Sequence, residues 1–135
     1  MARFFRDMTL VFGAGCLGGL VNSLLVWICG DTGITVAAGV RIAPALTVAW
    51  LYPRIVWGGL WGALFLLPVR RNRLWLSGLV FSLGPSAVQL FYIFPSVAGK
   101  GLMGFDLGLL TPVFVLVFNA AWGLSAAFWL QVIKR

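Results

Sequence analysis

The chain has 135 residues, of which 61% are apolar and 10% are charged, and its mean hydropathy is +1.03. Ten basic residues outweigh three acidic ones, so the formal net charge is +7. In a soluble protein this balance would suggest nucleic-acid binding. Here the basic residues flank long apolar segments, so we expect an integral membrane protein that contacts anionic lipids and no nucleic acid.

The sequence also lacks the residue patterns of metal and redox sites. Histidine is absent, and Cys16 and Cys29 are 13 residues apart in one apolar segment. On a helix that spacing is about 20 Å, well beyond the roughly 7 Å between Cα atoms that a disulfide tolerates. No cluster of residues has the spacing of metal ligands. We expect no metal, no cofactor and no disulfide within the chain.

Two apolar stretches occupy the first half of the chain. The first, 9–29, is too long for the core of a cleavable signal peptide and should be a membrane span. The second, 44–67, should bend at Pro53. Residues 34–43 should lie in the outer interface or re-enter the membrane. Alternatively, the second span starts at Pro53, which leaves about 15 residues and is short for a bilayer.

The second half of the chain contains two further stretches. The third, 74–94, should kink at Gly84-Pro85 and end before Pro95, because proline disfavours helical geometry in the residue that precedes it. The fourth, 111–133, should be a continuous span. We therefore predict one all-α transmembrane domain, residues 1–135, built as a bundle of four transmembrane helices.

The distribution of basic residues predicts the orientation of this bundle. Four spans put both termini on one side of the membrane, and positively charged residues are enriched on the cytoplasmic side. We expect an inner-membrane protein with both termini in the cytoplasm. Seven basic residues fall on the side of the termini and three on the other: Arg3, Arg6, Arg70, Arg71, Arg73, Lys134 and Arg135 against Arg41, Arg54 and Lys100.

Small residues recur at a spacing of four in every predicted span. Such faces let helix backbones approach closely in lipid. They should pack the helices of one protomer together, and the alternative is a homo-oligomer interface. The pairs are Gly15 and Gly19, Gly58 and Gly62, Gly78 and Ser82, and Ala121 and Ser125.

Four polar residues lie at similar depth in the four predicted spans. Asn22, Arg54, Gln89 and Asn119 are each 13 to 15 residues from the cytoplasmic end of their span, which is about 20–22 Å along a helix. Polar side chains at this depth are costly when they face lipid, so they should meet one another or line a wet cavity. Alternatively, Arg54 extends to the outer headgroups and the amides only link helices.

This polar layer is the predicted solute-binding site. Arg54 suits a small anion, and Arg41, Tyr92 and Lys100 could form its outer approach. No acidic residue lies within a span for proton coupling, and no base is placed to activate a serine, so we expect no enzyme. The predicted function is an uncoupled transport or channel module for a small anionic or polar solute. The alternative is a non-catalytic accessory, lipid-interacting or structural subunit.

Overall fold

The computed structural model describes residues 1–68 and 71–133, and within these ranges it contains helices and no strands. In this part of the chain, three helical segments are long and apolar enough to cross a membrane: Ala2–Asp31, Leu74–Val97 and Thr111–Ile133. The all-helical prediction and membrane-length helices are thus confirmed. Three residues of the predicted charge bias, Arg70, Lys134 and Arg135, lie outside the described residues, as does the side chain of Arg71.

The two longest helices are α1 (Ala2–Asp31) and α6 (Thr111–Ile133). The bounds of α6 agree with the predicted stretch 111–133. The helix α1 begins seven residues before the predicted stretch 9–29, because backbone hydrogen bonds can continue a helix through polar residues. Hydropathy therefore located the apolar part of α1 and missed its first two turns.

The segment between α1 and the next long helix differs from the prediction. The short helix α2 (Ile34–Ala37) is followed by residues 38–47, which run without regular helix alongside the end of α1, where Ala43 packs on Gly30. The helix α3 (Val48–Trp61) starts four residues after the predicted Pro44. The side-chain oxygen of Thr47 accepts a hydrogen bond from the backbone N–H of Trp50, which caps the helix and fixes its start.

A proline also lies inside the next helix. Pro53 is within α3, and the chain continues beyond Trp61 as the 3₁₀ helix η1 (Gly62–Leu66). After the 3₁₀ turn η2 (Arg71–Arg73), the chain returns through the helices that carry the third predicted stretch.

The third stretch is broken into three helical segments. They are α4 (Leu74–Phe81), α5 (Leu83–Val88) and the π-helix η3 (Gln89–Val97). The break at Ser82 lies close to the predicted kink at Gly84-Pro85. The predicted end at Phe94 is wrong, because the helix continues through Pro95. The wider π-helical turn accommodates a residue that lacks a backbone N–H. The 3₁₀ turn η4 (Leu102–Gly104) then leads to α6.

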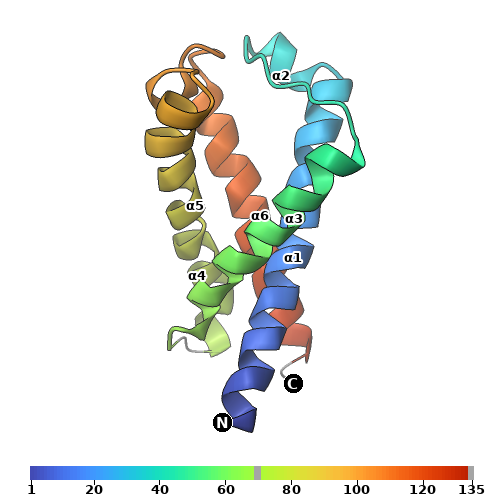
Figure 1. The fold of residues 1–135 in the computed structure, drawn as a ribbon, viewed down its shortest axis with the longest axis vertical. Coiled ribbons are helices and arrows are strands. Elements are labelled where there is room, and N and C mark those ends of the chain that lie inside the picture. Colours follow the sequence, from blue (N-terminus) through green and yellow to red (C-terminus); the bar gives the residue numbers. More distant parts are fainter. Residues whose placement is uncertain (69–70, 134–135) are drawn as a thin grey trace.

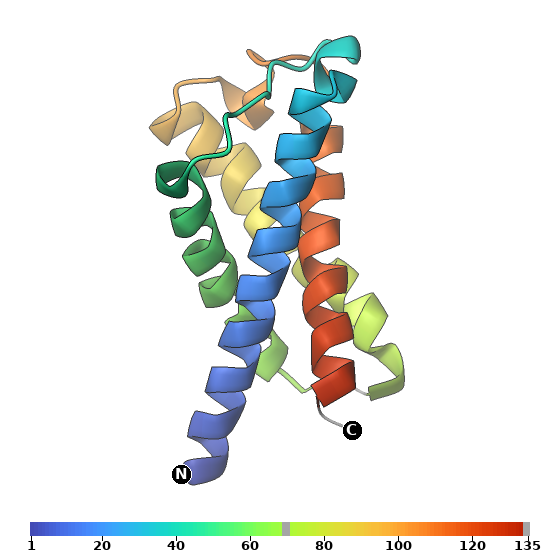
Figure 2. The ribbon, with the colours of Figure 1, turned by 90° about the vertical axis from the view of Figure 1, so that its right-hand side faces the viewer.

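The long segments run in alternating directions along one axis (Figure 1). The start of α1 and the end of α6 lie at the same end of the molecule, which we call the terminal end, and α2 lies at the opposite end. Turning the molecule by 90° shows α1 between α3 and α6 (Figure 2). On the other side of α6 lies α4, while α3 packs mainly on α1.

Glycines make the close contacts between these helices. A Cβ atom on Gly58 would lie 2.8 Å from the carbonyl oxygen of Gly15, and one on Gly78 would collide with the carbonyl oxygen of Gly123. The predicted small-residue faces at Gly15, Gly58 and Gly78 are therefore occupied within the protomer. An apolar core next to these contacts fills the terminal half of the bundle, and its buried residues are Val11, Ala14, Phe65, Trp122, Ala126, Ala127 and Leu130.

Candidate functional site

The side chain of Arg54 points from α3 toward α1, where it meets two neutral side chains. Its Nη2 donates a hydrogen bond of 2.8 Å to Oδ1 of Asn22, and its Nε donates one of 3.0 Å to Oγ of Ser23. The guanidinium carbon lies 4.7 Å from the centre of the Trp50 ring, one helical turn earlier on α3. Arg54 is thus held over an aromatic face with two of its five N–H donors occupied.

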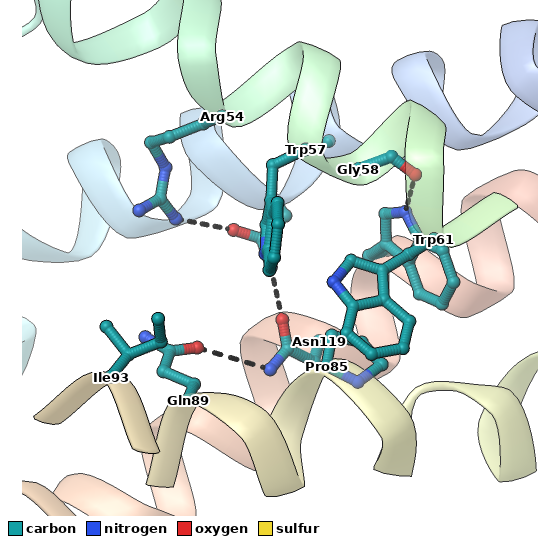
Figure 3. A pocket seen from close by; sticks show the side chains of 11 residues that line it. Arg54, Trp57, Gly58, Trp61, Pro85, Gln89, Ile93 and Asn119 are labelled. Atoms are coloured by element: carbon teal, nitrogen blue, oxygen red, sulfur yellow. Dashed lines mark hydrogen bonds between the residues drawn. The ribbon is translucent and has the colours of Figure 1, made fainter. Parts of the chain in front are cut away.

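Asn22 and Asn119 extend this chain of hydrogen bonds from α1 to α6. The Asn22 amide donates to Oδ1 of Asn119 at 3.1 Å and to the backbone oxygen of Phe118 at 2.8 Å. The Asn119 amide in turn donates to Oγ of Ser86 at 3.0 Å and to Oε1 of Gln89 at 3.4 Å. Both asparagines are only 7% exposed. All four residues of the predicted polar layer therefore belong to one connected network, and three of its links are visible in Figure 3.

Two cavities adjoin this network, and Asn22, Arg54 and Gln89 line both of them. The first, of about 190 Å³, lies between α3 on one side and α5 and η3 on the other (Figure 3). We call it the inner cavity, and its remaining lining is mostly apolar: Gly19, Trp57, Gly58, Trp61, Pro85, Ile93, Asn119 and Trp122.

The second cavity, of about 380 Å³, extends toward the end of the molecule where α2 lies. We call it the outer cavity. Its lining includes Arg41 and Ile42 from the segment after α2 and Leu107 from the loop before α6. Each volume far exceeds the roughly 10–15 Å³ that one water requires, so a small hydrated solute fits in either cavity.

The residues of the predicted outer approach separate in the structure. Arg41 lines the outer cavity, its backbone N–H donates to the backbone oxygen of Leu107 at 2.9 Å, and its Nη2 donates to the backbone oxygen of Asp106. Tyr92 is exposed on η3 and Lys100 is exposed on the loop that follows. Neither of these two residues lines the inner or the outer cavity. The structure thus brings Arg41 to the site and places Tyr92 and Lys100 elsewhere.

The positive charge of Arg54 has no ionised partner among the described residues. The acidic side chains of the chain are Asp7, Asp31 and Asp106. Among residues 1–68 and 71–133, the ion pair found joins Arg6 to Asp7 at 3.8 Å. Three N–H donors of Arg54 have no protein acceptor in these ranges. The site therefore offers an anion a fixed cation with free donors.

Several residues of the site were missed in the sequence. Ser23 and Ser86 hold the network together, and both are buried. Trp50, Trp57 and Trp61 were also overlooked. Relative to Arg54 they lie four residues before, three after and seven after, which is the spacing of one helical face. That periodicity, centred on a charged residue, is the signal that could have identified these three tryptophans as part of the site.

Trp122 lines the inner cavity and also belongs to the apolar core of the terminal half. Its indole N–H is shared between the backbone oxygens of Gly15 and Gly58, each at 3.2 Å. This contact joins α6 to α1 and α3 at the base of the inner cavity. Its ring also packs 6.1 Å from that of Phe65 in the apolar core. In this conformation the core separates the inner cavity from the terminal end.

We find no match to this chain among family models, curated proteins or solved structures.

Proposed function

We propose that this chain is an uncoupled transport or channel module that passes a small anionic or polar solute through a helical membrane bundle. Asn22, Arg54, Gln89 and Asn119 form its solute layer. The observation that carries the proposal is the position of Arg54. It borders both cavities, it has free donors, and no carboxylate faces it among residues 1–68 and 71–133.

The proposed bundle crosses an inner membrane four times, with both termini in the cytoplasm. The fourth crossing is made by α3 and η1, whose 14 and 5 residues add up to about 31 Å at helical rises of about 1.5 and 2.0 Å per residue. That length is similar to the roughly 30 Å of a bilayer core. Arg3, Arg6 and Arg73 mark the terminal end as the cytoplasmic side under the positive-inside rule.

The two asparagines act as a scaffold within this layer, and Arg54 and Gln89 meet the solute. All four amide N–H donors of Asn22 and Asn119 point to protein acceptors. The guanidinium of Arg54 keeps three donors free, and the amide nitrogen of Gln89 donates to no acceptor in the described chain. Passage then requires a second conformation, in which the apolar core at Phe65 and Trp122 opens.

Flux through proteoliposomes tests this proposal. Liposomes that contain the wild-type protein should release at least one of four solutes, chloride, nitrate, urea or glycerol, faster than liposomes without protein do. Arg54→Gln should abolish that flux while the folded protein is still recovered. Arg73→Gln is the matched control, because it removes the same charge from an exposed residue far from the cavities.

The saturated asparagines also suit the alternative function, in which the chain is an accessory, lipid-interacting or structural membrane subunit and the network only fixes helix register. In that case no solute of the panel would cross, and Arg54→Gln would behave as Arg73→Gln does in every assay except stability.

A further inference from the structure

The inner cavity presents a further free donor in addition to Arg54 and Gln89. The indole nitrogen of Trp61 is buried and has no hydrogen-bond partner among the described residues. In Figure 3 it faces the space between Trp57 and Asn119, on the side of the cavity. Burying an N–H donor without an acceptor is costly, so an acceptor that enters the cavity and bonds this N–H would remove that cost.

The walls around these donors are largely aromatic and apolar. Trp57, Trp61 and Trp122 line the inner cavity together with Pro85 and Ile93. Aromatic rings carry their positive potential at the edge, where the indole N–H lies, and their negative potential on the face. An anion is therefore directed to the edge of Trp61 and to the guanidinium of Arg54, and away from ring faces.

Such walls also select among anions by their hydration. A strongly hydrated dianion loses more free energy on leaving water than the cavity, with one cation and neutral donors, can return. The guanidinium is itself weakly hydrated compared with an ammonium group. A small monovalent anion that gives up its water readily is the ligand that fits this combination.

We infer that the solute of this site is a small, weakly hydrated monovalent anion, such as nitrate or bromide, bound in the inner cavity that Arg54 and Trp61 both line. This inference rests on the proposed role of Arg54 as the solute-binding cation. It adds the class of solute and a third binding residue after Arg54 and Gln89. It also predicts that free anions bind in preference to the phosphate of a lipid headgroup.

Thermal unfolding of the purified protein in detergent tests the inference separately from transport. Sodium gluconate is replaced stepwise by nitrate, bromide, sulfate or phosphate at constant ionic strength, and a soluble short-chain phosphatidylglycerol is titrated in parallel. Sulfate and phosphate stabilise folded proteins in general because they are excluded from protein surfaces, so each Tm shift is measured relative to that of Arg54→Gln in the same salt. By this difference nitrate and bromide should stabilise the wild type, and the other three should not. Trp61→Phe keeps an aromatic ring and removes the N–H, so it should need roughly tenfold more nitrate for the same shift.

The matched control is Trp75→Phe. Trp75 is an exposed residue of α4 whose ring lies 6.1 Å from that of Phe128, and it lines neither cavity. This variant should respond to nitrate as the wild type does. The inference is overturned if Trp61→Phe and Trp75→Phe respond alike, or if no anion stabilises the wild type more than it stabilises Arg54→Gln. It is also overturned if, by this difference, sulfate, phosphate or the phospholipid is as effective as nitrate.

A second measurement needs no change at Trp61, in case Trp61→Phe is not recovered folded. In wild-type protein with ¹⁵N-labelled tryptophans, nitrate should move at least one of the seven indole N–H signals, and it should move none in Arg54→Gln. A wild-type spectrum that nitrate leaves unchanged contradicts the inference.

Flux that depends on Arg54 but not on Trp61 removes this inference alone, whereas the absence of any flux removes the proposed function.

Discussion

Arg54 on α3 and Asn22 on α1 are joined by a hydrogen bond of 2.8 Å between Nη2 and Oδ1. The same asparagine donates to Asn119 on α6, so one amide connects three helices. A neutral acceptor orients the guanidinium without cancelling its charge. This is the geometry expected of a cation that is kept available for a mobile anion, since a carboxylate in the place of Asn22 would form a permanent ion pair.

The network should contribute measurably to stability. Asn119→Ala removes the three side-chain hydrogen bonds that Asn119 makes with Asn22, Ser86 and Gln89. Hydrogen bonds between membrane helices contribute about 0.6 kcal/mol each on average, so the loss of three should lower the free energy of unfolding by about 2 kcal/mol. Unfolding by denaturing detergent measures this loss. The exposed Asn72→Ala is the control, and an equal effect of both variants would refute the structural role of the network.

Two glycines of α1 should respond oppositely to alanine. A Cβ atom on Gly15 would lie 2.9 Å from Cα of Gly59 and would collide with the backbone oxygen of Gly58, whereas one on Gly13 would meet nothing within 4 Å. Gly15→Ala should therefore destabilise the protein by about 1–3 kcal/mol. Gly13→Ala should be neutral or stabilising by up to about 1 kcal/mol, because alanine has the higher helix propensity.

Thermal unfolding of these two variants side by side checks this contrast. Their chemistry and their helix are the same, so only the contact with α3 differs. Equal Tm values for Gly15→Ala and Gly13→Ala would mean that α1 and α3 do not approach as closely as the structure has them.

Arg41 should accelerate anion uptake from the outer side. It lines the outer cavity, and a positive charge there raises the local concentration of anions. Arg41→Ala should slow flux about two- to fivefold at low ionic strength, with a smaller effect in 0.5 M salt, because exposed charges are screened. Lys100→Ala removes the same charge from a residue outside both cavities and should have no such effect. Flux measurements in which both variants slow equally would exclude a specific role for Arg41.

The termini should both be cytoplasmic. Separate fusions of a reporter that is active only in the cytoplasm and of one active only outside it, each placed at the C-terminus, measure the side of α6 directly. Activity of the cytoplasmic reporter alone is expected from the arginines near the terminal end. Activity of the external reporter, or of both, would contradict the proposed orientation.

Much of the fold could be predicted from apolar length and helical rise. The stretch 111–133 has the bounds of α6, and the common depth of Asn22, Arg54, Gln89 and Asn119 agrees with a network that links them. Depth along a helix follows from counting residues, because the rise per residue is constant. This is why the polar layer could be identified without knowledge of the packing.

The remaining features depend on specific hydrogen bonds that hydropathy does not encode. The start of α3 at Val48 depends on the cap by Thr47, and the passage of the third stretch through Pro95 depends on a π-helical turn. Which outer basic residue reaches the site depends on the loop contacts of Arg41 with Asp106 and Leu107. Such contacts join residues more than 60 positions apart, so they could not be inferred from the pattern of one segment.

The central claim is that the unpaired charge of Arg54 holds a free anion in the inner cavity. Crystals of the wild-type protein grown in a lipid phase and soaked in bromide, with anomalous diffraction recorded at the bromine edge, test it most directly. The account predicts an anomalous peak in the inner cavity, within hydrogen-bond distance of the Arg54 guanidinium, and no such peak in Arg54→Gln. A cavity without a peak in the wild type, or a lipid phosphate bound to Arg54 in its place, would contradict it.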